Sequence, residues 1–335
     1  MDALTLFPKE LLDSLISPRP GETKLGQCFA LLDSFTPQAL NQAKANGARY
    51  ALLGVSEDVG PRANLGQGGA DHSFTPAIKA FANLQSNRFF DGEQCLLVGH
   101  ISLSHPQIED ELDALRLAVA QLDDAVTQTV TMLLTAGLVP VVIGGGHNNA
   151  YGLLRATSEH HGKGVAAVNL DPHCDFRPLE GRHSGNGFSY AADQGYLAQY
   201  HILGLHEQKN SEASLQQLEA FGGSWHSFQD IWVRRTISLE NALTQIIEAN
   251  NKQPVGLELD LDAISELPSS AITFAGVPLT DACHYISSLA THCPCAYLHL
   301  AEAAPARHPA GIEAGKRVTG QAIAELLLAY MSGKP

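Results

Sequence analysis

Basic residues are scarce in this 335-residue chain, which has 21 Lys and Arg against 35 Asp and Glu and a formal net charge of −14. Because a nucleic-acid surface needs clustered Lys and Arg, we expect no nucleic-acid partner. Long apolar runs are also missing: none approaches the roughly 20 residues that span a bilayer, so we expect no membrane insertion. The opening residues, MDALTLFPKELLDS, lack the basic stretch and apolar core of a signal peptide, which predicts a cytoplasmic protein.

Cysteine is present at six positions without any zinc or redox spacing, since Cys293-Pro-Cys295 is C-x-C and not C-x-x-C. We therefore expect free thiols that are buried as small apolar side chains. The glycine run at 144–146 is followed by neither a Lys-Ser/Thr pair nor G-x-G-x-x-G spacing, which excludes the common phosphate-binding loops. Internal repeats and low-complexity linkers are absent too, so the main part of the chain is expected to form one domain.

Continuous apolar runs alternate with amphipathic stretches along most of the chain. The runs predict eight strands, at 49–55, 95–101, 139–143, 164–170, 200–205, near Trp225, at 254–261 and at 296–300. Helices are predicted at 74–83, 107–137, 148–161, 238–249 and 319–331. Strands without in/out alternation are typical of a parallel sheet that helices cover on both faces. We therefore predict a single three-layer α/β/α domain over residues 49–335, preceded by a helical N-terminal extension over residues 1–48.

The stretch 169–178, NLDPHCDFRP, places three candidate metal ligands directly after a predicted strand. Asp171, His173 and Asp175 stand at alternate positions, so they share one face if the chain stays extended. Two carboxylates and an imidazole suit manganese, zinc or iron. The alternative is an acidic surface loop with an incidental His.

Two other predicted strands end in similar residues. His147 follows Gly144-Gly145-Gly146, and Asp260 and Asp262 follow the strand at 254–261. Alone, each motif has a structural alternative: a His fixed in a glycine turn, or a solvated pair of carboxylates. Ligands of parallel sheets bind beyond the carboxyl ends of the strands, so all three motifs should meet at one edge. Four crowded carboxylates repel one another unless cations neutralise them, and two divalent ions would do so.

With these motifs, the chain resembles the arginase–agmatinase–formimidoylglutamase family of ureohydrolases. The resemblance covers about residues 50–331 and rests on GGGHNNAYG (144–152), NLDPHCDFRP (169–178), RHSGNGFSYA (182–191), LELDLD (257–262) and LHLAEAAP (298–305). It implies an arginase-like fold with a mainly parallel eight-stranded sheet, two manganese ions per subunit, and a homo-oligomer, either a trimer or a hexamer.

The resemblance also implies roles for individual residues. One manganese would be held by His147, Asp171, Asp175 and Asp260, and the other by His173, Asp171, Asp260 and Asp262. Asp175 would in addition contact the bridging hydroxide and carry its proton to the leaving nitrogen. Glu302 would bind the amidino group. The chain departs from the family at Pro172, where Ala is usual, and at Glu258, where Ser is common. The usual Asp-Pro after the second D-x-D is also missing.

The substrate class depends on the charge around the site. Arg62, Arg177 and Arg182 lie in candidate site loops, and Asn186 lies in the RHSGNGFSYA motif. Arginine binds carboxylates through two parallel hydrogen bonds, so these residues are candidates to bind a substrate with a carboxylate tail. The alternative for each arginine is a structural ion pair.

The residues around Arg177 resemble formimidoylglutamases most. In arginases an Asn tends to stand at Arg177 and a catalytic His at Phe188. We therefore predict hydrolysis of N-formimidoyl-L-glutamate to L-glutamate and formamide. A guanidino-acid or agmatine-type ureohydrolase that releases urea is the alternative within the enzyme class. A family member that has lost its chemistry and acts as a binding protein is the alternative outside it.

Overall fold

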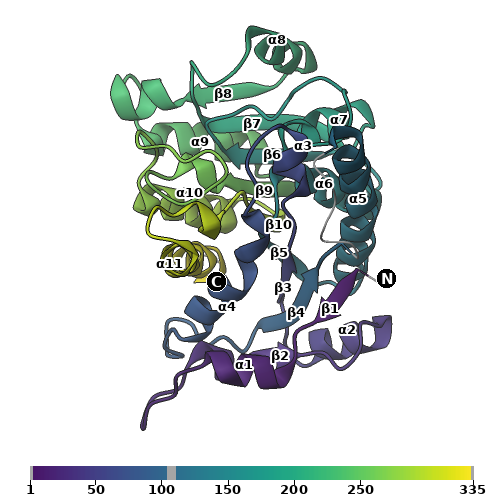
Figure 1. The fold of residues 1–335 in the computed structure, drawn as a ribbon, viewed down its shortest axis with the longest axis vertical. Coiled ribbons are helices and arrows are strands. Elements are labelled where there is room, and N and C mark those ends of the chain that lie inside the picture. Colours follow the sequence, from purple (N-terminus) through teal and green to yellow (C-terminus); the bar gives the residue numbers. More distant parts are fainter. Residues whose placement is uncertain (1–2, 104–110, 333–335) are drawn as a thin grey trace.

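The computed structural model describes residues 3–103 and 111–332. Its centre is a ten-stranded sheet (Figure 1). The strands are β1 (Leu4–Leu6), β2 (Ala30–Leu31), β3 (Tyr50–Val55), β4 (Cys95–Ile101), β5 (Val139–Ile143), β6 (Val165–Leu170), β7 (Leu197–Leu205), β8 (Ser224–Ser227), β9 (Val255–Asp260) and β10 (Cys295–Ala301). Their order is β1-β4-β3-β5-β10-β9-β6-β7-β8, with β2 also paired to β4. Every pairing is parallel except that of β1 with β4.

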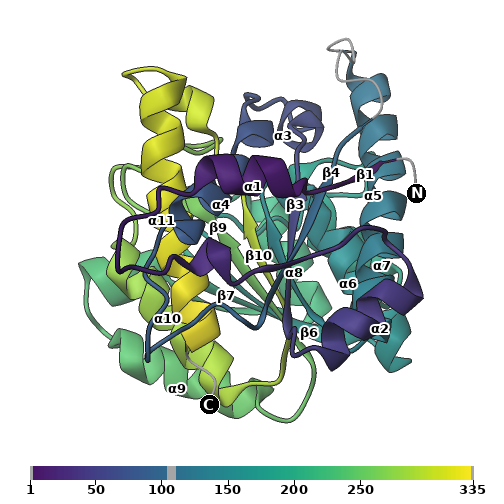
Figure 2. The same ribbon diagram turned by 90° about the horizontal axis from the view of Figure 1, so that it is seen from below.

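Helices cover both faces of the sheet. They are α1 (Lys9–Leu15), α2 (Pro37–Ala45), α3 (Val59–Ala63), α4 (Phe74–Ala82), α5 (Leu112–Thr135), α6 (Ala150–His161), α7 (Gly187–Asp193), α8 (Glu212–Phe221), α9 (Leu239–Asn250), α10 (Leu279–His292) and α11 (Ile312–Ser332). Buried side chains of α4, α9, α10 and α11 pack against one face, and those of α2, α5, α6, α7 and α8 against the other. Figure 2 shows α9–α11 and α5–α6 on opposite sides of the strands. The two apolar layers are why the central strands are buried on both faces, as the continuous apolar runs predict.

Local signals set the ends of several helices. Thr36 caps α2 by accepting a hydrogen bond from the Ala39 amide, and Pro37 occupies the first helical position. Ser211 caps α8 in the same way, through the Ser214 amide. Helix α5 ends just before Gly137, whose left-handed φ of 74° is typical of a helix C-terminus.

The eight predicted strands are all present, but the sheet is larger than predicted because the N-terminal stretch adds β1 and β2. Residues 1–48 were expected to be helical, and only α1 and α2 fulfil that expectation. Both added strands pair with the outer side of β4, whose backbone groups would otherwise be unpaired. The boundary at residue 48 stays a prediction. The predicted start of the helix at 107–137 lies outside the described residues, and the described helix begins at Leu112.

The sheet order brings the candidate ligands together. Strands β5, β10, β9 and β6 are neighbours at its centre and run parallel, so their carboxyl ends meet at one edge. Within the described residues the six cysteines form no disulfide; four of them are buried, as expected, whereas Cys28 and Cys283 are only partly buried. Among residues 3–103 and 111–332, no helix combines the length and the apolar character that a bilayer-spanning segment needs.

Candidate metal centre

A glycine turn places His147 at the end of β5. Gly144 and Gly145 have left-handed φ values of 88° and 71°. A Cβ at Gly145 would lie 2.7 Å from a carboxylate oxygen of Glu57, so a larger residue does not fit. The same oxygen of buried Glu57 accepts the Gly146 amide at 2.7 Å. The Glu57 carboxylate therefore holds the turn in place, and the turn positions His147 in the buried edge of the sheet.

The loop after β6 brings in three more predicted ligands. Asp171 accepts hydrogen bonds from the His173 amide at 2.6 Å and from the Asn169 side chain at 2.9 Å. The chain does not stay extended as the sequence suggested, because β6 ends at Leu170 and Asp175 has a left-handed φ of 45°. This backbone turn, and not strand alternation, returns the Asp175 carboxylate to the site.

The ends of β9 and β10 complete the cluster. Asp260 is the last residue of β9 and accepts the Asp262 amide at 2.7 Å. Glu302 follows β10 with a left-handed φ of 67°. Its Oε1 accepts the His147 amide at 2.7 Å, whereas its buried Oε2 has no hydrogen-bond partner in the described part of the chain. One carboxylate oxygen of Glu302 thus remains available to a ligand.

The six predicted metal ligands form two adjoining groups. In the first group, Nδ1 of His147 lies 3.1 Å from Asp175, 3.2 Å from Asp260 and 3.3 Å from Asp171. The second group contains His173, Asp260 and Asp262, whose nearest ligand atoms lie within 4.8 Å of one another. Nδ1 of His173 lies 3.5 Å from Asp171 Oδ1, so Asp171 and Asp260 stand between the two groups. The first group contains all four residues of one predicted ligand set, and the second contains three of the four residues of the other.

The electrostatics of the cluster fit bound cations. Burial and the charge of Asp262 raise the pKa of Asp260 well above its usual value and that of Glu302 to about 8. Burial lowers the pKa of His147, but its hydrogen bonds to the surrounding carboxylates outweigh this and raise it well above normal. In the absence of cations, some of these buried side chains must therefore hold protons, because so many close carboxylate charges repel one another. Two imidazoles and four carboxylates are a donor set suited to a pair of divalent ions such as manganese.

A cavity of about 390 Å³ opens beside these groups. Its walls include His173, the three carboxylates Asp175, Asp260 and Asp262, and Glu302. They also include two cationic side chains, Arg177 and Lys209, together with polar residues such as Asn64, Ser184, Asn210 and Ser270. The cavity thus connects the acidic metal-type cluster to a region that would attract an anionic group.

Comparison with known proteins identifies the family. Residues 49–331 match the family model described as the arginase family. This chain belongs to the arginase family. A formimidoylglutamase of Chromobacterium violaceum is 28% identical over 243 residues, which cover 69% of this chain and 72% of that relative. As a member of the family, the protein is a hydrolase that acts on C–N bonds of amidino-type groups.

Solved structures of arginase-family enzymes share the fold. Formimidoylglutamase of Bacillus subtilis superposes with a TM-score of 0.77 at 18% identity, covering 95% of this chain and 93% of that one. A Trypanosoma cruzi formiminoglutamase with Mn²⁺ gives 0.73 at 16% identity, covering 94% and 100%. The proclavaminate amidino hydrolase of Streptomyces clavuligerus gives 0.71 at 20% identity, covering 95% and 100%.

Of the four predicted substrate-binding residues, Arg177 lines the cavity and the other three do not. Arg177 lines the cavity, with its side chain 44% exposed, and donates to Asn64 at 2.6 Å and to Glu180 at 3.0 Å. Arg62 forms an ion pair with Asp58 at 3.3 Å and is not among the residues that line the cavity.

Arg182 and Asn186 are not among the residues that line the cavity. Arg182 is buried, binds both oxygens of Asp123 at 2.8 and 3.1 Å, and donates to Asn186 at 2.7 Å. Its guanidinium also lies over the rings of Tyr151 and Tyr190. This geometry favours a supporting role for the loop after β6, which is the alternative that the sequence left open.

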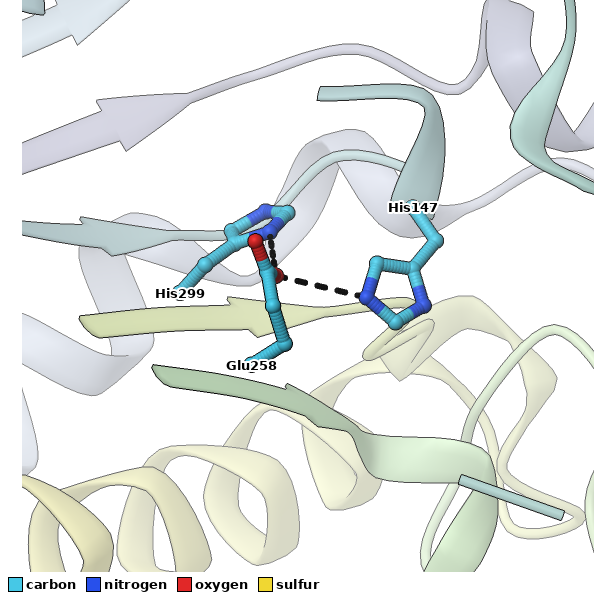
Figure 3. A group of neighbouring side chains, drawn as sticks. All are labelled: His147, Glu258 and His299. Atoms are coloured by element: carbon cyan, nitrogen blue, oxygen red, sulfur yellow. Dashed lines mark hydrogen bonds and ion pairs between the residues drawn. The ribbon is translucent and has the colours of Figure 1, made fainter. Parts of the chain in front are cut away.

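Two residues at or beside the site, Lys209 and Glu258, were given no role in the sequence prediction. Lys209 follows β7, and the rule that site residues follow strands could have found it. Glu258 lies on β9 two residues before Asp260, and its buried carboxylate contacts His147 and His299 (Figure 3). Its place in the alternation of β9 was a usable signal, since residues 258 and 260 share one face of the strand.

Proposed function

We propose that this protein hydrolyses N-formimidoyl-L-glutamate to L-glutamate and formamide with a pair of manganese ions. The observation that carries the proposal is the cavity, which places two cationic side chains beside the buried carboxylate cluster. A substrate with its formimidoyl group at the carboxylate cluster and its carboxylate tail near Arg177 and Lys209 would complement both ends of the cavity. The related formimidoylglutamase and the fold shared with a manganese-containing formiminoglutamase support the same assignment.

The two adjoining groups would hold the metals. His147, Asp171, Asp175 and Asp260 would bind one ion, and His173, Asp171, Asp260 and Asp262 the other. When bound, the manganese pair supplies Lewis acidity that makes a water molecule nucleophilic at neutral pH. The carboxylates that lie between the groups would then be neutralised, which removes the repulsion that burial creates.

Protein side chains would position the substrate and move the proton. The unpaired oxygen of Glu302 would accept an N–H of the formimidoyl group. In the reaction, the oxygen of water bonds to the formimidoyl carbon and the bond from that carbon to the glutamate nitrogen breaks. Asp175, which lines the cavity, would accept the proton of the water and return it to the leaving nitrogen.

The glutamate moiety would lie against the cationic side of the cavity. Hydrogen bonds to Asn64 and Glu180 orient the guanidinium of Arg177 before substrate binds. The main-chain amide of Arg177 donates to the Gly185 carbonyl at 3.0 Å, which fixes its backbone. Lys209 is half-buried and forms no ion pair within the described residues. A carboxylate would give Lys209 a partner and would share the charge of Arg177.

Hydrolysis of a guanidino acid with release of urea is the second candidate. Its support is the shared fold with an amidino hydrolase, and the same cavity would accept a guanidinium at the cluster and a carboxylate at Arg177. Agmatine fits less well, because its tail is cationic and would meet Arg177 and Lys209.

A product screen tests these alternatives. Manganese-loaded protein is incubated with formimidoylglutamate, arginine, agmatine and guanidinobutyrate, and formamide, urea and ammonia are measured, with His147→Ala as the control. Formamide from formimidoylglutamate alone supports the proposal. Urea from guanidinobutyrate supports the second candidate. No product from any substrate, despite two bound metals, would support a binding protein.

A further inference from the structure

A buried polar cluster lies under the candidate metal centre, between β9 and β10. His299 on β10 pairs directly with Glu258 on β9, and Tyr297 pairs with Gly256. Alternate residues of a strand share a face, so Gly256, Glu258 and Asp260 form one line that ends in the metal cluster. A Cβ at position 256 would lie 2.3 Å from the Tyr297 hydroxyl oxygen, so glycine leaves the room that this hydroxyl needs.

Both oxygens of Glu258 are engaged inside the protein. Tyr297 donates its hydroxyl to Oε1 at 2.6 Å, and Nδ1 of His299 donates to Oε2 at 2.7 Å. Glu258 and His299 have no exposed surface, and Nε2 of His299 has no hydrogen-bond partner within the described part of the chain. Nδ1 is therefore the ring nitrogen of His299 that faces Glu258 as a hydrogen-bond donor.

His147 faces the two clusters with its two ring nitrogens. Its Nδ1 lies among the three carboxylates of the first metal group, at 3.1 to 3.3 Å. Its Nε2 lies 3.3 Å from Oε2 of Glu258, on the opposite side of the ring (Figure 3). That contact is within ion-pair distance, and Nε2 forms no hydrogen bond to any described residue. Glu258 is therefore the acceptor that faces this nitrogen.

We propose that Glu258 is a positioning residue that fixes the tautomer and strengthens the donor character of His147. A proton on Nε2 directed at the carboxylate leaves the Nδ1 lone pair free for a cation, and the negative charge makes the imidazole a stronger ligand. Glu258 does not line the cavity, so it acts through His147 and not on substrate. The inference rests on the proposed metal centre, and it gives a function to the residue that replaces the serine common in the family.

His147, Glu258 and His299 also have the geometry of a separate metal site, because their nearest ligand atoms lie within 4.8 Å of one another. The hydrogen bonds argue against this reading. Each oxygen of Glu258 already accepts a hydrogen bond from Tyr297 or His299, and both donors would have to be displaced or deprotonated before a cation could bind. A third equivalent of metal, lost in Glu258→Gln, would overturn the proposal in favour of a metal site.

Metal affinity of Glu258→Gln tests the proposal. Manganese is removed from the full-length protein and added back, and free ion is followed by electron paramagnetic resonance. Loss of an outer partner of a metal-binding histidine typically weakens affinity about 10- to 100-fold. We expect that loss at one of the two sites, with two ions still bound at saturation. Tyr297→Phe is the matched control, because it removes a hydrogen bond to Glu258 without touching His147, and its affinities should stay within about threefold of the parent. Parent affinities in Glu258→Gln would overturn the proposal.

A second measurement needs no variant at Glu258. In zinc-loaded protein labelled with ¹⁵N-histidine, the ring nitrogens of His147, assigned through His147→Asn, should show a protonated Nε2 and a metal-bound Nδ1. A deprotonated or metal-bound Nε2 would overturn the proposal even if Glu258→Gln failed to fold. Both tests are independent of substrate. If the parent binds two metals but does not hydrolyse formimidoylglutamate, the proposed function fails and this inference stands.

Discussion

Replacing Arg177 tests the choice of substrate most directly. Its guanidinium lines the cavity beside Asp175, and we expect Arg177→Ala to weaken binding of the carboxylate tail without removing metal. Arg177→Lys should restore only part of the loss, because an ammonium group lacks the planar pair of donors. The assay is kcat/KM on formimidoylglutamate, measured beside manganese content and melting temperature.

The structure sets the expected size of the effect. A hydrogen-bonded contact to a charged group contributes about 1.5–3 kcal/mol, and about 1.4 kcal/mol corresponds to a tenfold change. The Arg177 side chain is 44% exposed and already donates to Asn64 and Glu180, so solvent and these partners reduce what a substrate carboxylate gains. We therefore expect a free-energy loss at the lower end of that range, which corresponds to a decrease of about tenfold in kcat/KM. Removing Lys209 as well should lower kcat/KM further, to roughly 100-fold below the parent if the two contributions add.

Arg62→Ala is the matched control, since Arg62 lies on the neighbouring helix α3 but does not line the cavity. It should leave kcat/KM within about twofold. Unchanged kcat/KM in Arg177→Ala would refute the carboxylate role. Loss of metal or a lower melting temperature at unchanged KM would instead show that Arg177 mainly holds the loop through Glu180.

Four further outcomes are expected. Elemental analysis should find about two manganese ions per chain and fewer in His147→Ala; at most one ion in the parent would exclude a binuclear centre. Asp175→Asn should keep much of its metal, since Asn tolerates the left-handed φ of 45°, but should lose about 10²- to 10⁴-fold in kcat. Turnover near the parent rate in the metal-loaded variant would refute the proton-transfer role. Burial lowers the pKa of His173, but its hydrogen bond to a neighbouring carboxylate outweighs burial and raises the pKa to about 9 in the absence of metal. Manganese binding below that pH should therefore release protons, and the affinity for manganese should increase as the pH rises. Calorimetry in buffers of different ionisation enthalpy measures the number of protons released. Arg182→Ala should lower the free energy of unfolding by about 3–5 kcal/mol by leaving buried Asp123 unpaired, as urea denaturation would show; a higher KM at unchanged stability would restore its substrate role.

The parts of the fold that follow from burial were predictable. Strands such as β3 and β6 are buried at every position, so their apolar runs were unambiguous in the sequence. The two strands of the N-terminal stretch were not predictable in this way. β1 has three residues and β2 has two, and both exist because the outer side of β4 needs hydrogen-bond partners. Such pairing depends on tertiary contact, which a short sequence pattern does not record.

The meeting of the candidate ligands was predictable because it follows from topology. Each candidate ligand stands next to the end of a strand, and parallel neighbours bring those ends to one edge. The substrate residues were harder, because an arginine in a loop looks the same whether it faces a cavity or a buried acid. The partner of Arg182 is Asp123 on α5, 59 positions earlier in the chain, and nothing local in the sequence connects them. Glu258 was visible as an exception to the family pattern, but its meaning required the register of β9 and β10.

Two of the candidate site carboxylates lie in a backbone conformation that normally favours glycine. Asp175 and Glu302 have left-handed φ values of 45° and 67°, which cost of order 1–3 kcal/mol each in a non-glycine residue. Glycine would relieve that cost but would remove the side chain that the proposed chemistry needs. The surrounding contacts hold Glu302 in place: its amide donates to the Gly145 carbonyl at 2.9 Å, and its carboxylate accepts the His147 amide at 2.7 Å. The loop after β10 and the glycine turn after β5 therefore fix each other, so a change in either should displace both Glu302 and His147.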